Sequence, residues 1–279
     1  MLRFGDTDVL IVCPQGVPHE EYRYQNHCLA GYFVGHFSVD SLEMLPSVYQ
    51  ELDLGFDFYS PQVFSDGERK ILVGWIGMPD LTDTVESAEN GWLYCLTMPR
   101  ELTLKQGHIY SAPVKEIENL RQECKDINVS NTEKISEQLG DGTESDLTIK
   151  FGDAQKVEVA LQYEGEKLTM TYDRATQVLF IDRNGMKLGG KGIRPFNDGK
   201  NTDVNIGTRK IKIYADETLQ FRLFVDHSAI ELFLQDGEYA ASMLIYPEKG
   251  TAPKLEISAD KPIENICGKI WTLGKLNYA

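Results

Sequence analysis

The residues best suited to chemistry lie between positions 51 and 80. A carboxylate and an aromatic hydroxyl stand two positions apart there, at Asp57 and Tyr59. Residues of equal parity share one face of a β-strand, so a strand over 55–64 would place Asp57, Tyr59 and Pro61 side by side. Carboxylates accept hydrogen bonds from paired hydroxyl donors, and aromatic rings stack on the C–H faces of sugars. The pattern predicts a clamp for sugar hydroxyls; the alternative is that Asp57 caps a turn and Tyr59 packs in the core.

Short strands broken by turn residues must position this cluster. Alternating apolar and polar residues predict strands over 9–13, 31–37, 56–64, 70–75, 91–98 and 101–104. Antiparallel strands at regular spacing suit propeller blades or a sandwich. A blade takes roughly 40–50 residues, so residues 1–112 supply about two blades of a partial β-propeller. Two blades cannot close a ring, and we therefore expect an open edge and exposed apolar surface.

A short helix and a second all-β region are predicted for the rest of the chain. A proline followed by apolar residues at helical spacing predicts a linker helix over 113–124. Further strands are predicted over 147–151, 156–163, 167–173, 177–182, 210–214, 220–225, 229–234, 241–246 and 254–258. The dipeptide at 236–237 is Asp-Gly, which predicts a two-residue hairpin turn between two of these strands. Residues 125–279 are therefore predicted to form a C-terminal β-sandwich, entered through a solvated loop over 131–146.

The composition narrows the classes of function. The formal net charge of −15 argues against nucleic acid, whose phosphates would be repelled across most of the surface. No apolar run approaches the roughly 18 residues that a membrane-spanning helix needs, and the first residues do not read as a signal peptide. We therefore expect a chain that binds neither nucleic acid nor membrane.

The cysteines and histidines point to neither disulfides nor metal. Five cysteines are an odd number, and they are widely spaced without a Cys-x-x-Cys pair, which favours a reducing cytoplasm. The five histidines show no spacing typical of a metal site. No cofactor or metal is expected. Asp226-His227-Ser228 contains the residue types of a nucleophilic triad, but consecutive residues cannot converge on one substrate, so a hairpin corner is predicted. The glycine-rich stretch 189–192 is predicted to be a turn.

Several motifs, in order along the chain, resemble those of one enzyme family. They are LDLGFDFYSPQVF at 52–64, ILVGWIGMPD at 71–80, the stretch 90–114 containing TMPRELTL, LFVDHSAIELFLQDGE at 223–238 and IYP at 245–247. Together they resemble the β-fructosidases of glycoside hydrolase family 32, the group of invertases and sucrose-6-phosphate hydrolases. The resemblance implies the last blades of a five-bladed propeller followed by the β-sandwich.

The resemblance also implies an activity and a set of binding residues. Family members hydrolyse β-D-fructofuranosides by double displacement without a cofactor, and sucrose or sucrose 6-phosphate would be the substrate. Tyr59 and Trp75 match the positions that line the fructose pocket, and Asp53 and Asp57 fall near the pocket rim. These four are the substrate-binding residues that we expect.

The family's catalytic motifs do not occur in this sequence. Its nucleophile lies in Asn-Asp-Pro-Asn-Gly, its stabilising aspartate in Arg-Asp-Pro and its acid/base glutamate in Glu-Cys-Pro, and none of these is present. Residues 1–16 resemble the segment that follows Glu-Cys-Pro, while Glu123-Cys124 repeats only the dipeptide and is a chance match. We therefore expect no catalytic residues in this chain and no hydrolysis by it alone.

Three hypotheses follow for the chain as a whole. It is the C-terminal part of a β-fructofuranosidase; it is a noncatalytic carbohydrate-binding or assembly module built on the sandwich; or it is the product of a broken gene or a misassigned start, with the family's activity belonging to the full-length parent. Its partners would be a small sugar and either a second copy of the chain or a complementing N-terminal fragment.

Overall fold

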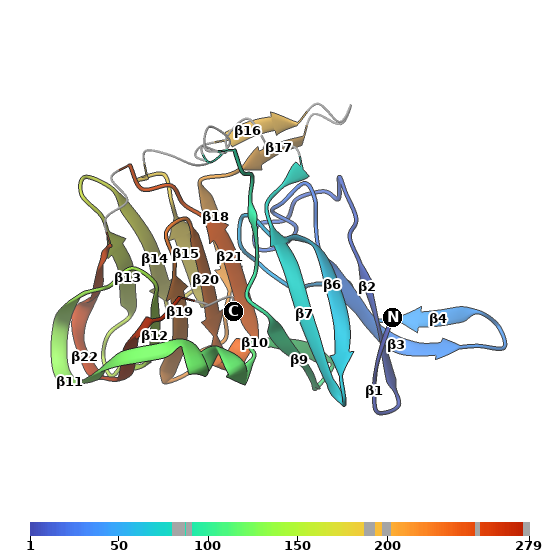
Figure 1. The fold of residues 1–279 in the computed structure, drawn as a ribbon, viewed down its shortest axis with the longest axis horizontal. Helices are drawn as coiled ribbons and strands as arrows, with labels where there is room; N and C mark the ends of the chain where they lie inside the picture. Colours follow the sequence, from blue (N-terminus) through green and yellow to red (C-terminus); the bar gives the residue numbers. More distant parts are fainter. Residues whose placement is uncertain (80–86, 88–90, 187–192, 197–201, 249–251, 276–279) are drawn as a thin grey trace.

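The computed structural model describes residues 1–79, 87, 91–186, 193–196, 202–248 and 252–275. Within these ranges the chain forms two small sheets in its N-terminal half and one large curled sheet in its C-terminal half (Figure 1). A two-stranded ribbon, β16 (Ile193–Phe196) with β17 (Thr202–Asn205), completes the fold. The prediction of an all-β chain, with a partial propeller followed by a sandwich, is confirmed.

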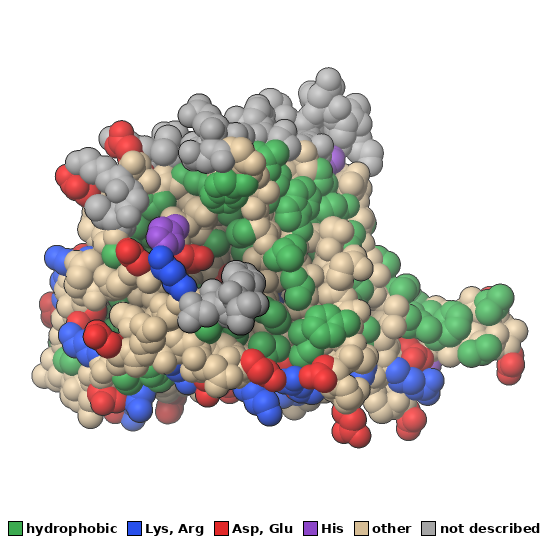
Figure 2. Space-filling view, in the orientation of Figure 1, with side chains coloured by type: hydrophobic (Ala, Val, Ile, Leu, Met, Phe, Trp, Pro, Cys, Tyr) green, Lys and Arg blue, Asp and Glu red, His purple; other side chains and the backbone are tan. Residues whose placement is uncertain are grey.

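The first small sheet has the spatial order β1–β2–β3–β4, with β5 also paired to β3. Its strands are β1 (Leu2–Phe4), β2 (Thr7–Val12), β3 (Gly31–Ser38), β4 (Glu43–Pro46) and β5 (Gln50–Glu51). The hairpin of β3 and β4 projects from the body of the molecule, and Figure 2 shows hydrophobic side chains gathered on it. Val39, Leu42 and Leu45 are exposed there. This half therefore presents apolar surface, as expected for so few blades.

The second small sheet has the order β10–β9–β7–β6, with β8 paired to β7. Its strands are β6 (Tyr59–Asp66), β7 (Arg69–Ile76), β8 (Cys95–Leu96), β9 (Arg100–Lys105) and β10 (His108–Pro113). Apolar side chains from both small sheets pack in one core between them: Val9, Ala30, Tyr32, Leu52, Phe58, Leu72, Leu102 and Ile109. The alternation of these residues along the strands is what made the strands predictable.

The strand predicted over 56–64 begins later than expected. β6 starts at Tyr59, Ser60 has a positive φ of 47°, and the pairing with β7 shifts register between Tyr59 and Gln62. Asp57 therefore precedes the strand, and the parity argument that placed it on the same face as Tyr59 is wrong. A bulge re-aims the side chains on either side of it, which strict alternation cannot describe.

The connection between the halves is shorter than predicted. A 3₁₀ helix covers Lys115–Leu120, and strand β11 already begins at Arg121. The expected helix over 113–124 is therefore a tight turn of six residues followed by strand.

The C-terminal half is one sheet of ten strands, in the order β18–β15–β14–β13–β22–β12–β19–β20–β21, with β11 paired to β22. The strands are β11 (Arg121–Gln138), β12 (Thr143–Lys150), β13 (Lys156–Gln162), β14 (Lys167–Asp173), β15 (Val178–Asp182), β18 (Thr208–Lys212), β19 (Thr218–Val225), β20 (Ala229–Leu234), β21 (Tyr239–Leu244) and β22 (Lys254–Leu273).

Two long strands turn this single sheet into a sandwich. The first part of β22 pairs with β13, from Lys254 to Ala259, and its last part pairs with β12, from Asn265 to Thr272. β11 follows both parts of β22, with a register shift between Thr132 and Lys134. The sheet therefore curls back on itself and encloses a large apolar core.

The solvated loop predicted over 131–146 is wrong for most of its length. Residues up to Gln138 continue β11, and β12 begins at Thr143. Glu144 of β12 is fully buried, and its carboxylate forms ion pairs with Arg121 and Arg222, both at 2.7 Å. The charge of residues 131–146 suggested a solvated loop, but Glu144 is instead part of a buried group of ion pairs.

The hairpin corner predicted at 226–228 is confirmed, whereas the two-residue turn predicted at 236–237 is wrong. β19 turns into β20 through Asp226-His227-Ser228, and β20 turns into β21 at Gln235–Gly237. At the second corner residues 235–238 connect the paired Leu234 and Tyr239, so the connection is longer than a two-residue turn, and Gln235, Asp236 and Gly237 in it all have positive φ. The stretch 189–192 lies outside the described residues.

Candidate functional site

The structure brings Tyr59 and Trp75 together. They are direct partners across β6 and β7, and both side chains are half-buried. The ring of Tyr94 meets Trp75 edge-on, with ring centroids 4.8 Å apart. The Gln15 amide donates a hydrogen bond to the Tyr59 hydroxyl (3.1 Å). We call Tyr59, Trp75 and Gln15 the aromatic wall.

Two glycines on either side of Trp75 allow this packing. A Cβ at Gly74 would overlap the ring of Phe58, and a Cβ at Gly77 would lie 2.7 Å from the ring of Tyr94. Rings therefore press directly on the backbone next to Trp75, which fixes the orientation of the indole. The sequence pattern Gly-Trp-x-Gly is explained by this close approach.

Asp53 lies at the boundary between the two halves of the chain, where it bonds to Ser242. It is only 4% exposed. One carboxylate oxygen accepts hydrogen bonds from the backbone N–H groups of Gly55 and Ser242, both at 2.9 Å. The other accepts from Arg100 (2.9 Å) and from the Ser242 hydroxyl (2.7 Å). All four bonds go to protein, so Asp53 is a structural junction in this arrangement.

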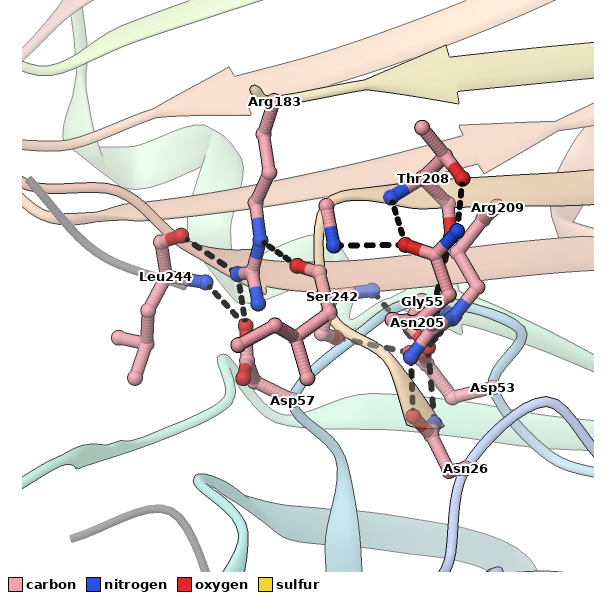
Figure 3. A network of polar contacts seen from close by, with 12 residues as sticks. Asn26, Asp53, Gly55, Asp57, Arg183, Asn205, Thr208, Arg209, Ser242 and Leu244 are labelled. Atoms are coloured by element: carbon pink, nitrogen blue, oxygen red, sulfur yellow. Dashed lines mark hydrogen bonds and ion pairs between the residues drawn. The ribbon is translucent and has the colours of Figure 1, made fainter. Parts of the chain in front are cut away.

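Asp57 lies at the same boundary and is 5% exposed. Its Oδ2 accepts hydrogen bonds from Arg183 Nη1 (2.6 Å) and from the backbone N–H of Leu244 (2.8 Å). Both partners come from the C-terminal half (Figure 3). The structure therefore separates the four predicted residues into an aromatic wall and a pair of interface aspartates.

Three buried arginines at this interface were not found from the sequence. Arg100 binds Asp53 and, at 2.5 Å, Glu231 of β20, and its guanidinium lies over the rings of Phe58 and Phe233. Burial opposes the charged form, but Glu231 and Asp53 outweigh it and raise the pKa of Arg100 above its usual value. Arg100 therefore remains a cation that ties the halves together.

Arg209 is a buried cation with neutral hydrogen-bond partners. It donates to the side chain of Asn26 and to the backbone carbonyls of Gly55, Asn205 and Thr208. Burial, and to a smaller degree the neighbouring cation Arg183, lower its pKa to about 9. Among the described residues, no carboxylate is bonded directly to Arg209.

Glu51 is the remaining acid at this boundary. Burial raises its pKa to about 7, although the backbone N–H of Tyr24 donates to its Oε2 (2.9 Å) and Arg209 and Arg23 both favour the ionised form. A carboxyl with such a pKa changes charge near neutrality.

Other candidate chemistry is weaker. Glu123 and Cys124 are exposed on strand β11. No group of three or more metal-ligating side chains occurs among the described residues. In the same residues we find no helix that has both the length and the hydrophobicity to cross a bilayer.

Comparisons with known proteins agree on one family. The profile of the N-terminal domain of glycosyl hydrolases family 32 matches residues 2–113, and the profile of its C-terminal domain matches residues 116–266. The sucrose-6-phosphate hydrolase of Staphylococcus xylosus is 32% identical over 87% of this chain and 47% of its own length. That of Bacillus subtilis is 30% identical, over 96% of this chain and 52% of its own.

Solved structures show the same fold. The sucrose-6-phosphate hydrolase of Lactobacillus gasseri superposes with a TM-score of 0.76 and 27% identity, over 95% of this chain and 52% of that one. The Bombyx mori β-fructofuranosidase gives a TM-score of 0.78 at 24% identity, over 98% and 53%. The chain spans about half the length of the relatives that it matches. From its motifs, its fold and these matches, it belongs to glycoside hydrolase family 32.

Proposed function

We propose that this chain supplies one wall of the fructosyl pocket of a β-fructofuranosidase acting on sucrose or sucrose 6-phosphate. The observation that carries the proposal is the direct pairing of Tyr59 with Trp75, in motifs that resemble the family's sugar-binding strands. Ring faces, a hydroxyl and the Gln15 amide are the groups that a binding site uses to orient a sugar. We place Asp53 and Asp57 at the rim of this pocket, where protein groups already hydrogen-bond their carboxylates.

The chain by itself binds sugar without hydrolysing it. Retaining hydrolysis requires two carboxyl groups about 5–5.5 Å apart across the scissile bond. The sequence contains none of the family's three catalytic motifs, and Asp57 is engaged by Arg183 at 2.6 Å. A carboxylate oxygen that accepts hydrogen bonds from an arginine and from a backbone N–H is not free to attack a sugar. Turnover therefore requires catalytic carboxylates beyond those in residues 1–279.

The exposed apolar side chains of the β3–β4 hairpin support a partner in this half of the molecule. Leu45 is 86% exposed and Val39 is 76% exposed. Exposed apolar side chains that cluster on one element mark a surface that another protein covers. A complementing N-terminal fragment that completes the propeller would cover this surface; a second copy of the chain is the alternative. The odd number and wide spacing of the cysteines favour the cytoplasm as the place of action.

Calorimetry and an activity assay test the proposal together. The purified chain should bind fructose, Tyr59→Ala should weaken that binding at least tenfold, and sucrose should not be hydrolysed above buffer. Exposed Tyr214→Ala, on the other half of the chain, is the matched control and should leave the affinity unchanged. Absence of fructose binding, or sucrose turnover that Tyr59→Ala abolishes, would contradict the proposal.

A complementation assay distinguishes the two hypotheses, a fragment of an enzyme and a noncatalytic module. The partner to mix with this chain is the N-terminal half of the Lactobacillus gasseri relative, of which this chain covers 52%. Appearance of sucrose hydrolysis in the mixture would support the fragment. Sugar binding that never leads to turnover would support the module.

A further inference from the structure

We infer that Asp53 and Asp57 form a two-carboxylate latch that closes the open edge of strand β21 and, by doing so, positions the aromatic wall. In this view Asp53, Asp57 and Arg183 are positioning residues. The closure of the edge stands on the geometry alone, whereas its consequence for sugar rests on the proposed function.

β21 is an edge strand that needs covering. It ends the order of the large sheet and pairs only with β20 among the described strands. An edge strand presents a row of backbone N–H and C=O groups that have no strand partner. On β21 these outward groups belong to Ala240, Ser242 and Leu244, since each of the three bonds across the interface rather than to β20.

The latch supplies acceptors for two of the outward N–H groups of this edge, those of Ser242 and Leu244. The N–H of Ser242 donates to Asp53 Oδ1 (2.9 Å), and the N–H of Leu244 donates to Asp57 Oδ2 (2.8 Å). A neighbouring strand would offer two carbonyl oxygens at these places. Two carboxylates four residues apart therefore take the part of a missing strand.

Donors from the interface satisfy the carbonyls of the same edge. The N–H of Leu54 donates to Ala240 O (2.8 Å), and the N–H of Phe56 donates to Ser242 O (2.9 Å). Arg183 Nη1 donates to Leu244 O (2.9 Å) as well as to Asp57. Figure 3 shows Asp57 and Leu244 both turned toward the Arg183 guanidinium. Arg183 thus bonds the last carbonyl of this edge and pairs with the Asp57 carboxylate of the latch, while Arg100 pairs with Asp53.

Gly55 lets the two backbones come this close. A Cβ at position 55 would overlap the backbone of Ser242. The carbonyl of Gly55 points the other way and accepts hydrogen bonds from Asn26 (2.9 Å) and Arg209 (3.2 Å). The loop is therefore held on both sides by groups that are buried.

The latch lies immediately before the wall in the chain. Only Phe58 separates Asp57 from Tyr59, and Phe58 is buried with its ring against Arg100. Tyr59 begins β6 directly after this anchored segment. The edge strand β21 therefore sets the position of Tyr59. Through Tyr59, the C-terminal sandwich contributes to sugar binding.

Amide hydrogen exchange by NMR tests the latch without any sugar. Asp57→Ala should raise the exchange rate of the Leu244 amide at least roughly tenfold, because its acceptor is gone, and should leave the Met243 amide, which faces β20, nearly unchanged. Asp57→Asn keeps one carbonyl oxygen, so the Leu244 amide should be nearly as well protected from exchange as in wild type. This variant also provides the comparison if the alanine variant does not fold. Glu144→Gln is the matched control: it perturbs a buried arginine-bound carboxylate inside the sandwich and should not single out Leu244.

Fructose calorimetry on the same variants tests the positioning role. Asp57→Ala should weaken fructose binding about tenfold, Asp57→Asn less, and Glu144→Gln not at all. Unchanged Leu244 exchange in Asp57→Ala would overturn the latch. Faster exchange with unchanged fructose affinity would overturn the positioning role. If the wild-type chain binds no fructose but the exchange contrast appears, the proposed function fails and the latch stands.

Discussion

Asp57 and Arg183 stand 126 residues apart in the chain and meet at 2.6 Å across the boundary between its two halves. Both side chains are almost completely buried, at 7% and 3% exposure. Transfer of two charges from water is expensive, and only good geometry with further hydrogen bonds offsets that cost. Leu244 supplies those bonds through its N–H and its carbonyl. The pair therefore joins the two halves in one defined orientation.

Removing the cation should destabilise the fold strongly. Arg183→Met leaves the Asp57 carboxylate buried without its partner, so the free energy of unfolding should fall by ~3–5 kcal/mol in urea titrations. Lys156→Met is the matched control, because its ion pair with Asp173 lies at the surface. That control should cost ~0–1 kcal/mol. Similar losses in both variants would contradict a special role for the buried pair.

The two partners should not act independently. Asp57→Asn removes the charge but leaves a carbonyl oxygen for Leu244. Combined with Arg183→Met, it should cost less than the sum of the single changes, with a coupling of ~0.5–3 kcal/mol in a double-mutant cycle. Additive losses would mean that each residue stabilises the interface through other contacts.

The backbones at Gly55 and Ser242 lie too close together for any side chain at position 55. In Gly55→Ala the new methyl group meets the backbone of Ser242, which cannot rotate away. We expect the free energy of unfolding to fall by ~1–3 kcal/mol. At Gly140 a Cβ would lie 3.2 Å from the terminal methyl group of Thr272, which can yield. Thermal unfolding should show Gly140→Ala near wild type, and the reverse order would disprove this account.

Glu51 should make stability depend on pH in one direction. Its pKa is about 7 in the folded chain, above the ordinary value of 4.5. Between these values the folded state keeps a proton that the unfolded state has released, so this group's contribution to stability is complete below about pH 4.5 and is lost as pH rises through 7.

The comparison with Glu51→Gln isolates this contribution from other titrating groups. The amide keeps an oxygen for the Tyr24 N–H but cannot ionise. Relative to wild type, the variant should gain on the order of 3 kcal/mol in the free energy of unfolding between about pH 4.5 and pH 7. Urea titrations at several pH values measure that difference. A constant difference across this range would contradict the raised pKa.

Regular alternation made much of the fold predictable. The strands predicted over 167–173 and 229–234 coincide with β14 and β20, because apolar residues face the core at every second position. β11 was missed since most of its side chains are polar and exposed, and its partner strand lies more than a hundred residues away. Backbone pairing at such a distance leaves no periodic signal in the local sequence.

Part of the candidate site was also predictable from the sequence, and part was not. The motifs around Tyr59 and Trp75 were sufficient to predict the family and the two aromatic residues that the structure pairs. The direction of Asp57 was not predictable, because the positive φ of Ser60 and the bulge in β6 end the alternation there.

The sequence by itself determined the β-strands, the family and the lack of the family's catalytic motifs, since all three are written in local patterns of residue types. Only the tertiary structure decided what the two aspartates touch. Their partners, Arg100, Arg183 and the edge of β21, come from distant parts of the chain and meet them only after both halves have folded. Contacts between such distant residues depend on how the sheets pack, which no local pattern encodes.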